Sequence, residues 1–466
     1  MMDLFSEAEP YRIKVVEPLK LTTRSQREET LRKAHYNLFN VPAEEVFVDL
    51  LTDSGTSAMS QYQWAGIMTG DESYAGCRNW FHLQEVVREI TGYPYVVPTH
   101  QGRPAENILM MLHLQPGLSA LGNMFFDTTH AHVLHKGGVP HNLVIEEGLD
   151  ATAEHPFKGN IDLDKLEDFL RREGREKVGL IHITITCNNN GGQPVSMENL
   201  RGVRAIADKY GVPFYLDAAR FAENAYFIKQ REPGYEKKSI REIAREMFSY
   251  ADGCTMSSKK DGLVNIGGFL ALRDEQKYRQ AQQYLILLEG FVTYGGMAGR
   301  DLEALAIGLQ EALDESYLAS RVRQVHLLGH LLLEAGVPTV RPIGGHCVMI
   351  DMKRFLPHIP QEQYPAEAFV AELYLDSGTR GCGLGQLAFG SEDPDTGEVV
   401  YSPLEVVRLA IPRRVYTDNH IRHVAKSVIR LYERREELRG MRLLWAPPGL
   451  RHFTAHLEPL GQAQPA

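Results

Sequence analysis

The most constraining feature of this sequence is an alternation of short apolar runs with helical patterns, which extends from about residue 90 to residue 275. VGLIHITI (178–185) precedes the helical pattern MENLRGVRAIADKYG (197–211), and the apolar run VPFYLDAA (212–219) follows it. Strands that are buried on both faces of a parallel sheet read as continuous apolar runs of this kind. The pattern therefore predicts an α/β domain with a mainly parallel sheet between two layers of helices.

The rhythm changes near residue 300, where a long amphipathic stretch begins. It is followed by the apolar strand GGHCVMIDM (344–352), a helix that begins at Pro365, and the strand VVRLAI (406–411). A chain of 466 residues also exceeds what one hydrophobic core usually spans. We predict a large domain at 51–310 and a small α+β domain at 311–466, joined by a long helix near 300–335. The first 50 residues carry weak signals, and we assign them to an N-terminal arm and part of the small domain.

The composition of the chain indicates which kinds of molecule it can bind. A formal net charge of -10 disfavours nucleic acid and anionic membranes, so we expect a small-molecule partner. The N-terminus has no signal-peptide pattern, and no run approaches the ~18 apolar residues of a membrane span, which predicts a cytoplasmic protein. The five cysteines lack CxxC spacing, so we expect reduced thiols and no zinc site. They are Cys77, Cys187, Cys254, Cys347 and Cys382.

Two charged side chains at strand ends suggest cofactor chemistry. Lys260 follows the apolar run that ends in Ser-Ser-Lys-Lys-Asp, and Asp217 ends the run FYLD. Taken singly, a lysine pair usually belongs to a solvated loop, and an aspartate after a strand usually caps the next helix. Pyridoxal phosphate (PLP), however, needs a lysine for covalent attachment and an acidic partner for its ring nitrogen. Asp217 and Lys260 can supply both groups at the edge of a sheet where ligands bind.

A third element precedes them in the chain. Gln101-Gly102-Arg103 lies between a strand and a helix, where backbone N–H groups can bind a phosphate. Such a tripeptide alone is more often an ordinary turn, but its combination with Asp217 and Lys260 favours a PLP site.

At this point the sequence resembles the β-eliminating lyases, the family of tryptophanase and tyrosine phenol-lyase, almost from end to end. Nine ordered motifs carry the resemblance: DLLTDSGT (49–56), GDESYAG (70–76), PTHQGRPAEN (98–107), NNNGGQPVS (188–196), DAARFAENAYFIK (217–229), MSSKKD (256–261), YGGMAGRD (294–301), IPRRVYT (411–417) and LRHFTA (450–455). The resemblance implies the aspartate-aminotransferase-like fold of type I PLP enzymes, with a sheet of the seven-stranded type.

The resemblance also implies roles for individual residues. Lys260 would hold the cofactor and remove the substrate α-proton, Asp217 would pair with the pyridinium, and Tyr74 would act on the leaving group as a general acid of reduced pKa. The remaining cofactor contacts would be Phe126 on the ring, Asn188 and Arg220 on the O3′ side, and Gln101, Gly102, Arg103, Ser257 and Lys259 at the phosphate. Arg408 would bind the substrate carboxylate, with Thr52, Ser54 and Asn188 nearby.

Three positions separate the two activities of the family. Asp127 and His452 stand where tryptophanases carry Asp and His and where tyrosine phenol-lyases carry Thr and Phe. Leu384 occupies the position at which phenol-lyases carry an arginine for the phenol oxygen. With Phe453 as a further pocket residue, we expect β-elimination of L-tryptophan to indole, pyruvate and ammonia. The alternative is tyrosine phenol-lyase activity, which framework stretches such as MFSYADGCTM favour.

The resemblance further implies a potassium or other monovalent cation at Gly55, Glu72 and Asn265, and a homotetramer with active sites at subunit contacts. Glu72 could equally be a plain loop carboxylate. His130 and His132 lack a further metal ligand, so we assign no transition metal. Two other classes remain open: an aminotransferase of the same fold, which would give no reason for Tyr74, Asp127 and His452, and a non-enzymatic scaffold.

Overall fold

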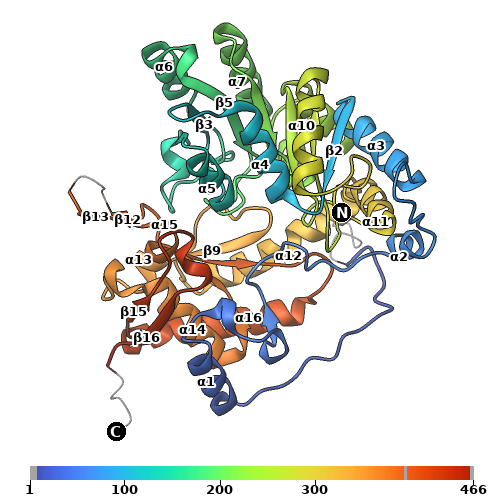
Figure 1. Ribbon diagram of the computed structural model, residues 1–466. Coiled ribbons are helices and arrows are strands. Elements are labelled where there is room, and N and C mark those ends of the chain that lie inside the picture. The colour runs from blue at the N-terminus through green and yellow to red at the C-terminus, as the bar shows by residue number, and fades with distance from the viewer. Residues whose placement is uncertain (1–7, 393–395, 462–466) are drawn as a thin grey trace.

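A computed structural model describes residues 8–392 and 396–461. The ends of the predicted arm and of the predicted small domain, at residues 1–7 and 462–466, and the short segment 393–395 lie outside the described residues. The chain forms a larger α/β part, which fills the upper half of Figure 1, and a smaller part below it.

The larger part is built on one seven-stranded sheet. From edge to edge its strands are β2 (Tyr95–Thr99), β8 (Gly268–Leu272), β7 (Gly253–Ser257), β6 (Phe214–Asp217), β5 (Val178–Thr184), β3 (Ser119–Gly122) and β4 (Val139–Asn142). The pairings from β7 through β4 are parallel, whereas β8 is antiparallel to both β7 and β2. The sheet is therefore mainly parallel, as predicted.

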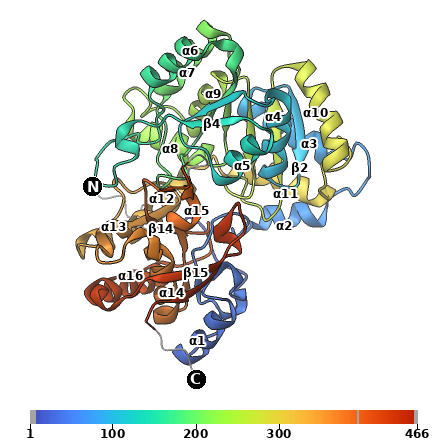
Figure 2. The same ribbon diagram turned by 60° about the vertical axis from the view of Figure 1, so that its left-hand side comes forward.

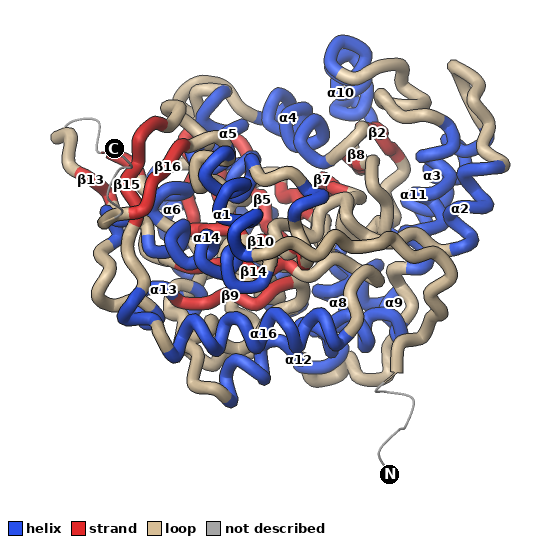
Figure 3. The backbone as a smooth tube through the Cα atoms, turned by 90° about the horizontal axis from the view of Figure 1, so that it is seen from below, coloured by secondary structure: helices blue, strands red, loops and turns tan. Residues whose placement is uncertain are grey.

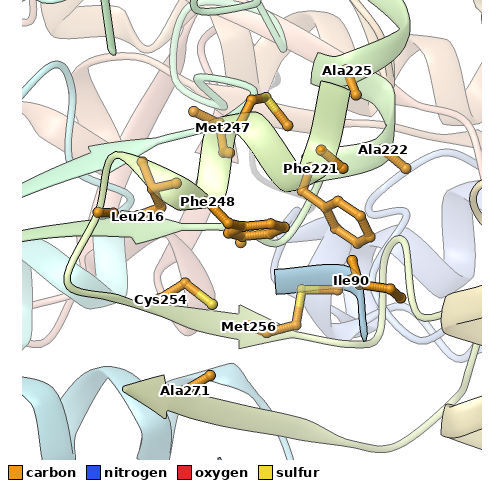
Figure 4. Close-up of a cluster of buried hydrophobic side chains, with 14 of the residues drawn as sticks. Ile90, Leu216, Phe221, Ala222, Ala225, Met247, Phe248, Cys254, Met256 and Ala271 are labelled. Atoms are coloured by element: carbon orange, nitrogen blue, oxygen red, sulfur yellow. The ribbon is translucent and has the colours of Figure 1, made fainter. Parts of the chain in front are cut away.

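Helices cover both faces of this sheet because alternate strand residues point to opposite sides. Tyr215 and Leu270 face α4 (Gly102–His113), α5 (Asp127–His135) and α10 (Glu275–Leu288). Leu216 and Ala271 face the other layer, where Figure 4 shows them with the rings of Phe221 and Phe248. That layer contains α3 (Arg78–Thr91), α6 (Leu163–Glu173), α7 (Met197–Tyr210), α8 (Phe221–Arg231), α9 (Ile240–Ser249) and α11 (Gly299–Glu311), and α2 (Gln61–Met68) packs on α11.

The smaller part contains the antiparallel sheet β11 (Cys382–Leu384), β14 (Val406–Ala410) and β9 (Cys347–Asp351). Its helices are α1 (Arg24–Lys33), α12 (Glu315–Glu334), α13 (Met352–Phe355), α14 (Pro365–Ser377), α15 (Gln386–Phe389) and α16 (Asp418–Glu433), and α12 and α16 lie side by side in Figure 3. The short pairs β1 (Val48–Asp49) with β10 (Thr379–Arg380) and β12 (Ser391–Glu392) with β13 (Val399–Val400) complete its strands, together with the hairpin described next.

Two ends of the described chain meet in this smaller part. The hairpin β15 (Met441–Trp445) and β16 (His456–Pro459) packs with α1, and Figure 2 shows both in the lower half of the molecule. Leu31, Val48 and Leu50 share one buried cluster with residues of α12, α14 and α16. This contact agrees with the assignment of the first 50 residues to the small domain, whose boundaries stay a prediction.

The predicted long helix near 300–335 is wrong in one respect, because it is two helices. α11 ends at Glu311, and α12 begins at Glu315 with Asp314 as its N-cap. The Asp314 carboxylate accepts the N–H of Tyr317, which stabilises a new helix start rather than continuation. Among the described residues, no helix is long and apolar enough to cross a membrane.

Candidate active site

One edge of the large sheet gathers the predicted cofactor residues. β5, β6 and β7 are parallel, and β2 shares their direction because β8 is antiparallel to both of its neighbours. The carboxyl ends of these four strands therefore lie at the same edge. The segments that follow them carry Gln101, Asn188, Arg220 and Lys260.

Most of the predicted residues line one pocket at this edge. They are Thr52, Ser54, Gln101, Gly102, Arg103, Phe126, Asp127, Asn188, Arg220, Ser257, Lys259, Lys260, Leu384, Arg408, His452 and Phe453. Asp217, Tyr74, Gly55, Glu72 and Asn265 are not among the lining residues.

Lys260 follows β7 and points its amine at the end of that strand. Its Nζ donates a hydrogen bond to Ser257 Oγ at 2.8 Å. Burial, and next the charge of Arg220, lower the pKa of Lys260 to about 8, although Asp53, Asp217 and Glu106 act in the opposite direction. An amine with this pKa can both accept and release a proton near neutral pH.

The start of α4 forms a turn against β7. Gly102 lies so close to Ser257 that an added Cβ would stand 2.6 Å from the Ser257 Cβ, so this contact requires glycine. No side chain caps α4, which leaves the N–H groups of its first turn free for an anion. Pro104 lies in that same turn, where proline fits a helix but contributes no N–H.

Asp217 ends β6, and Arg220 is the N-cap residue of α8. One Asp217 oxygen accepts the N–H of Ala219 at 3.2 Å, and Asp217 does not cap the helix, whose N-cap residue is Arg220. The Arg220 guanidinium donates to both carboxylate oxygens of Asp53, at 3.0 and 2.7 Å. Arg220 is thus held by the side chain between Thr52 and Ser54, and its predicted contact with the cofactor stays a prediction.

Arg408 brings a cation from the smaller part to this pocket. It lies on β14 and donates to Asn188 Oδ1 at 3.4 Å and to the Leu51 carbonyl at 3.2 Å. Within the part of the chain that the structure describes, its buried Nε has no hydrogen-bond partner. A guanidinium with an unused N–H suits a carboxylate ligand.

The opposite end of the pocket combines a carboxylate–imidazole pair with apolar walls. His452 Nε2 lies 3.6 Å from Asp127 Oδ2, and the buried His452 Nδ1 has no hydrogen-bond partner among the described residues. The Phe39 ring packs edge-on against both His452 and Phe453. Leu384 is buried in the wall beside them.

Comparison with known proteins places this geometry in a family. A model described as "Beta-eliminating lyase" matches residues 49–427. The chain belongs to that family. A tryptophanase from Salinibacter ruber is 54% identical over 451 residues, which cover 97% of this chain and 95% of that protein. A tyrosine phenol-lyase from Symbiobacterium thermophilum is 53% identical over 453 residues, which cover 97% of this chain and 99% of that protein.

A solved structure supports the predicted fold class of this β-eliminating lyase. An aminotransferase from Staphylococcus aureus superposes with a TM-score of 0.57 at 16% identity, covering 83% of this chain and 94% of that one. The likeness shows the fold alone. With the seven-stranded sheet and the small domain, it confirms the aspartate-aminotransferase-like fold of type I PLP enzymes.

Tyr74 lies outside the pocket of its own chain in this lyase. Its side chain is 68% exposed and packs on Phe291 and Tyr294. A hydrogen bond with Tyr294 raises the pKa of Tyr74 in the single chain. Its role as a general acid of reduced pKa stays a prediction.

The three predicted cation ligands are only partly brought together. Asn265 Nδ2 donates to the Gly55 carbonyl at 2.9 Å, so these two residues are neighbours. Gly55 has φ of +75°, and an added Cβ would stand 2.4 Å from Lys259 Cε. Glu72 lies elsewhere and pairs with Arg300 at 2.8 Å. Within the described residues, no group of three His, Cys, Asp or Glu side chains could hold a metal ion.

Two pocket carboxylates were missed by the sequence analysis. Asp53 stands between two predicted residues, and its ion pairs with Arg220 and Arg413 outweigh burial and hold its pKa well below the usual range. Glu106 lies on α4 and accepts the hydroxyl of Thr128 at 2.9 Å. Burial and then Asp217 raise the pKa of Glu106 to about 7. The sequence could have indicated Glu106 by its position, since it lies three residues after the Gln101–Arg103 turn that was predicted to bind the phosphate.

Proposed function

We propose that this chain is a tryptophanase, which cleaves L-tryptophan to indole, pyruvate and ammonia with bound PLP. The observation that carries the proposal is the Asp127–His452 pair at 3.6 Å beside the apolar side chain of Leu384. Residues at the other end of the pocket, such as Lys260 and Arg408, would serve steps that both activities of the family share. They therefore do not distinguish a tryptophanase from a tyrosine phenol-lyase.

The chain offers a fitting set of groups for PLP. Lys260 supplies an amine of lowered pKa for covalent attachment, and Asp217 supplies a buried carboxylate at the end of β6. The uncapped start of α4, with Ser257 against Gly102, fits a phosphate. When bound, PLP would withdraw electrons from the substrate Cα and so make its proton acidic.

The side chains then divide the work. Arg408, through its unpaired Nε, would orient the substrate carboxylate together with Thr52 and Ser54. Lys260 Nζ would accept the α-proton, and Ser257 Oγ would keep that amine in place. Asp127 and His452 would orient the leaving ring, so that a proton reaches indole C3 as the Cβ bond breaks.

Indole suits these walls better than phenol. A phenolic hydroxyl beside Leu384 would lose a hydrogen bond, at a cost of about 1–3 kcal/mol, while indole presents mostly carbon surface and one N–H donor. Asp127 offers an acceptor for that N–H. Overall similarity favours the alternative, since more of the relatives at 50–54% identity are named tyrosine phenol-lyase than tryptophanase. The proposal therefore rests on the pocket residues alone.

The test is identification of the aromatic product, with PLP and potassium supplied. We expect kcat/KM for indole release from tryptophan to exceed that for phenol release from tyrosine by about tenfold to a hundredfold. Leu384→Arg should narrow the gap, and adding Asp127→Thr and His452→Phe should move preference further toward tyrosine. A parent enzyme that already prefers tyrosine would establish the phenol-lyase alternative.

We further propose that Tyr74 and Glu72 act in an assembly, in which they reach the pocket and cation site of a second copy. The support is the exposure of Tyr74, the nearness of Gly55 to Asn265 without Glu72, and the resemblance to tetramers with active sites at subunit contacts. Potassium would then be held by Gly55 and Asn265 of one copy and Glu72 of another.

A further inference from the structure

The wall that faces the leaving ring is assembled from separate pieces of chain. Leu384 ends β11 and Phe389 ends α15, whereas His452 and Phe453 belong to a short 3-10 helix, η7 (Arg451–Phe453), between the strands of the β15–β16 hairpin. Without further contacts, an imidazole on such a short element would not have a fixed position relative to Asp127 and Leu384.

Arg451 links the two pieces directly. Its Nη2 donates to the carbonyl of Gln386 at 2.8 Å and to the carbonyl of Gly390 at 2.7 Å. Both carbonyls belong to α15 and its C-cap, where a cation is favourable. Arg451 itself does not line the pocket. It joins the helix that carries Phe389 to the helix that carries His452.

A second contact holds η7 from the opposite side. Asn37 Nδ2 donates to the His452 carbonyl at 3.1 Å and to the Ala455 carbonyl at 2.9 Å. The buried Asn37 lies two residues before Phe39, whose ring packs on His452 and Phe453. Asn37 therefore holds the backbone of η7 and of the residue Ala455 after it, whereas the Arg451 side chain makes the contact with α15, which follows β11 and Leu384.

From this geometry we infer that Arg451 is a positioning residue for the leaving group, which sets the distance between His452 and the wall that carries Leu384. The inference rests on the proposed function, in that it assumes an aromatic ring at this end of the pocket. Loss of the Arg451 contacts would misplace the imidazole but leave the other end of the pocket in place, because Asp217 ends β6, Lys260 follows β7, and Arg408 is held by Asn188 and the Leu51 carbonyl.

The test compares two leaving groups in the holoenzyme. Arg451→Met keeps the apolar stem and removes the donors, and Arg451→Lys keeps a donor. For Arg451→Met we expect kcat/KM for tryptophan to fall by about tenfold to a hundredfold, as a misplaced catalytic geometry does. Elimination from S-methyl-L-cysteine, whose leaving group has no ring, should stay within about twofold of the parent, and Arg451→Lys should recover part of the tryptophan rate.

The matched control is Arg442→Met on the same hairpin, because Arg442 is exposed and pairs with Glu458 of β16. It should leave both substrates unaffected. Equal losses for the aromatic substrate and S-methyl-L-cysteine would overturn the inference and assign Arg451 a general structural role, as would no loss for either. The parent's preferred aromatic substrate is measured first, and the Arg451 variants are then compared on that substrate. A preference for tyrosine would refute the tryptophan assignment, and the role of Arg451 would then be tested with tyrosine in place of tryptophan.

Discussion

Adjacent residues Lys259 and Lys260 have different surroundings. Lys260 Nζ bonds to Ser257 and lies within reach of the charges on Asp217 and Glu106. Lys259 packs over Gly55, whose N–H donates to the Lys259 carbonyl at 2.7 Å. Of the two lysines, Lys260 is the one whose amine has both a hydrogen-bond acceptor, Ser257 Oγ, and acidic neighbours.

We therefore predict that Lys260→Ala abolishes exchange of the substrate α-proton and the visible absorption of covalently attached cofactor. Lys259→Ala is the control and should keep both signals with weaker cofactor binding. Deuterium exchange followed by NMR, with an absorption spectrum of each variant, makes the measurement. If the losses fell on the Lys259 variant instead, the two lysines would have exchanged roles.

The sequence predicted site residues that lie at the ends of strands, but not contacts between residues that are far apart in the chain. Lys260 and Asp217 could be found because an apolar run ends at a charged residue. The Asp53–Arg220 pair joins residues far apart in the chain, and no local pattern encodes it. The surroundings of Tyr74 could not be predicted for the same reason, since they depend on contacts with Phe291 and Tyr294.

At the scale of elements, the apolar runs predicted the parallel core, but not the direction of β8. A run such as GFLAL is equally apolar in a parallel and in an antiparallel strand. Only the length of the connection before the strand distinguishes the two directions. The break at 312–314 was also missed, because the amphipathic pattern continues across it while Asp314 starts a new helix. The spacing of apolar residues shows which face of a helix is buried, whereas the start of a helix depends on a single capping side chain such as Asp314.

The packing of α14 against β11 gives a prediction about pH. Glu367 on α14 lies against Gly383, where an added Cβ would stand 2.6 Å from Glu367 Oε1. The buried Oε2 of Glu367 has no hydrogen-bond partner in residues 8–392 and 396–461. Burial, and next the charge of Glu405, raise the pKa of Glu367 from 4.5 to about 8. Because the folded protein favours the protonated acid, this group costs stability as the pH rises from the unfolded pKa through the folded one.

Glu367→Gln should therefore remove part of the loss of unfolding free energy between about pH 5 and pH 8.5, on the order of 2 kcal/mol relative to the parent. Urea unfolding at both pH values measures it. Glu372→Gln on the same helix is the control, since Glu372 pairs with Arg434 at 3.5 Å and is partly exposed. Parallel pH profiles for parent and Glu367 variant would contradict the assignment.

For the whole molecule, a buried charge network joins the large and small parts. Arg413 is fully buried and donates to Asp53 at 2.8 Å, Glu223 at 2.7 Å and Asp261 at 3.0 Å. Asp261 follows Lys260, and its carboxylate also accepts the N–H groups of Ala222 and Glu223 at the start of α8. One arginine of the small part thus fixes three segments around the lysine.

Arg413→Met should lower the unfolding free energy by about 3–5 kcal/mol, because it leaves buried carboxylates without a partner. Denaturant unfolding of the cofactor-free protein gives the value. The neighbouring Arg414 pairs with Glu311 at 2.9 Å, and Arg414→Met should cost clearly less. A loss below about 1 kcal/mol for Arg413→Met would show that solvent or neighbouring groups replace the network.

The proposed assembly predicts complementation between two inactive variants. Tyr74→Phe and Lys260→Ala chains, mixed by co-expression, should regain activity that neither has alone, since a site with Lys260 from one chain and Tyr74 from the other is complete. Tyr62→Phe, at another exposed tyrosine, should keep the parent rate. Verified mixed oligomers without activity would place Tyr74 at the site of its own chain.

The location of η7 near the end of the described chain has a consequence for protein synthesis. A nascent chain that has emerged as far as Glu437 already contains each residue predicted to hold the cofactor, from Gln101 to Lys260, but lacks His452 and Phe453. Asp127 and Leu384 are thus synthesised before Glu437, whereas His452 and Phe453 of the same leaving-group pocket follow it. For evolution and for protein engineering, the segment 441–459 is accordingly a short stretch of chain through which one part of that pocket can be changed while the cofactor-binding residues, Asp127 and Leu384 are kept.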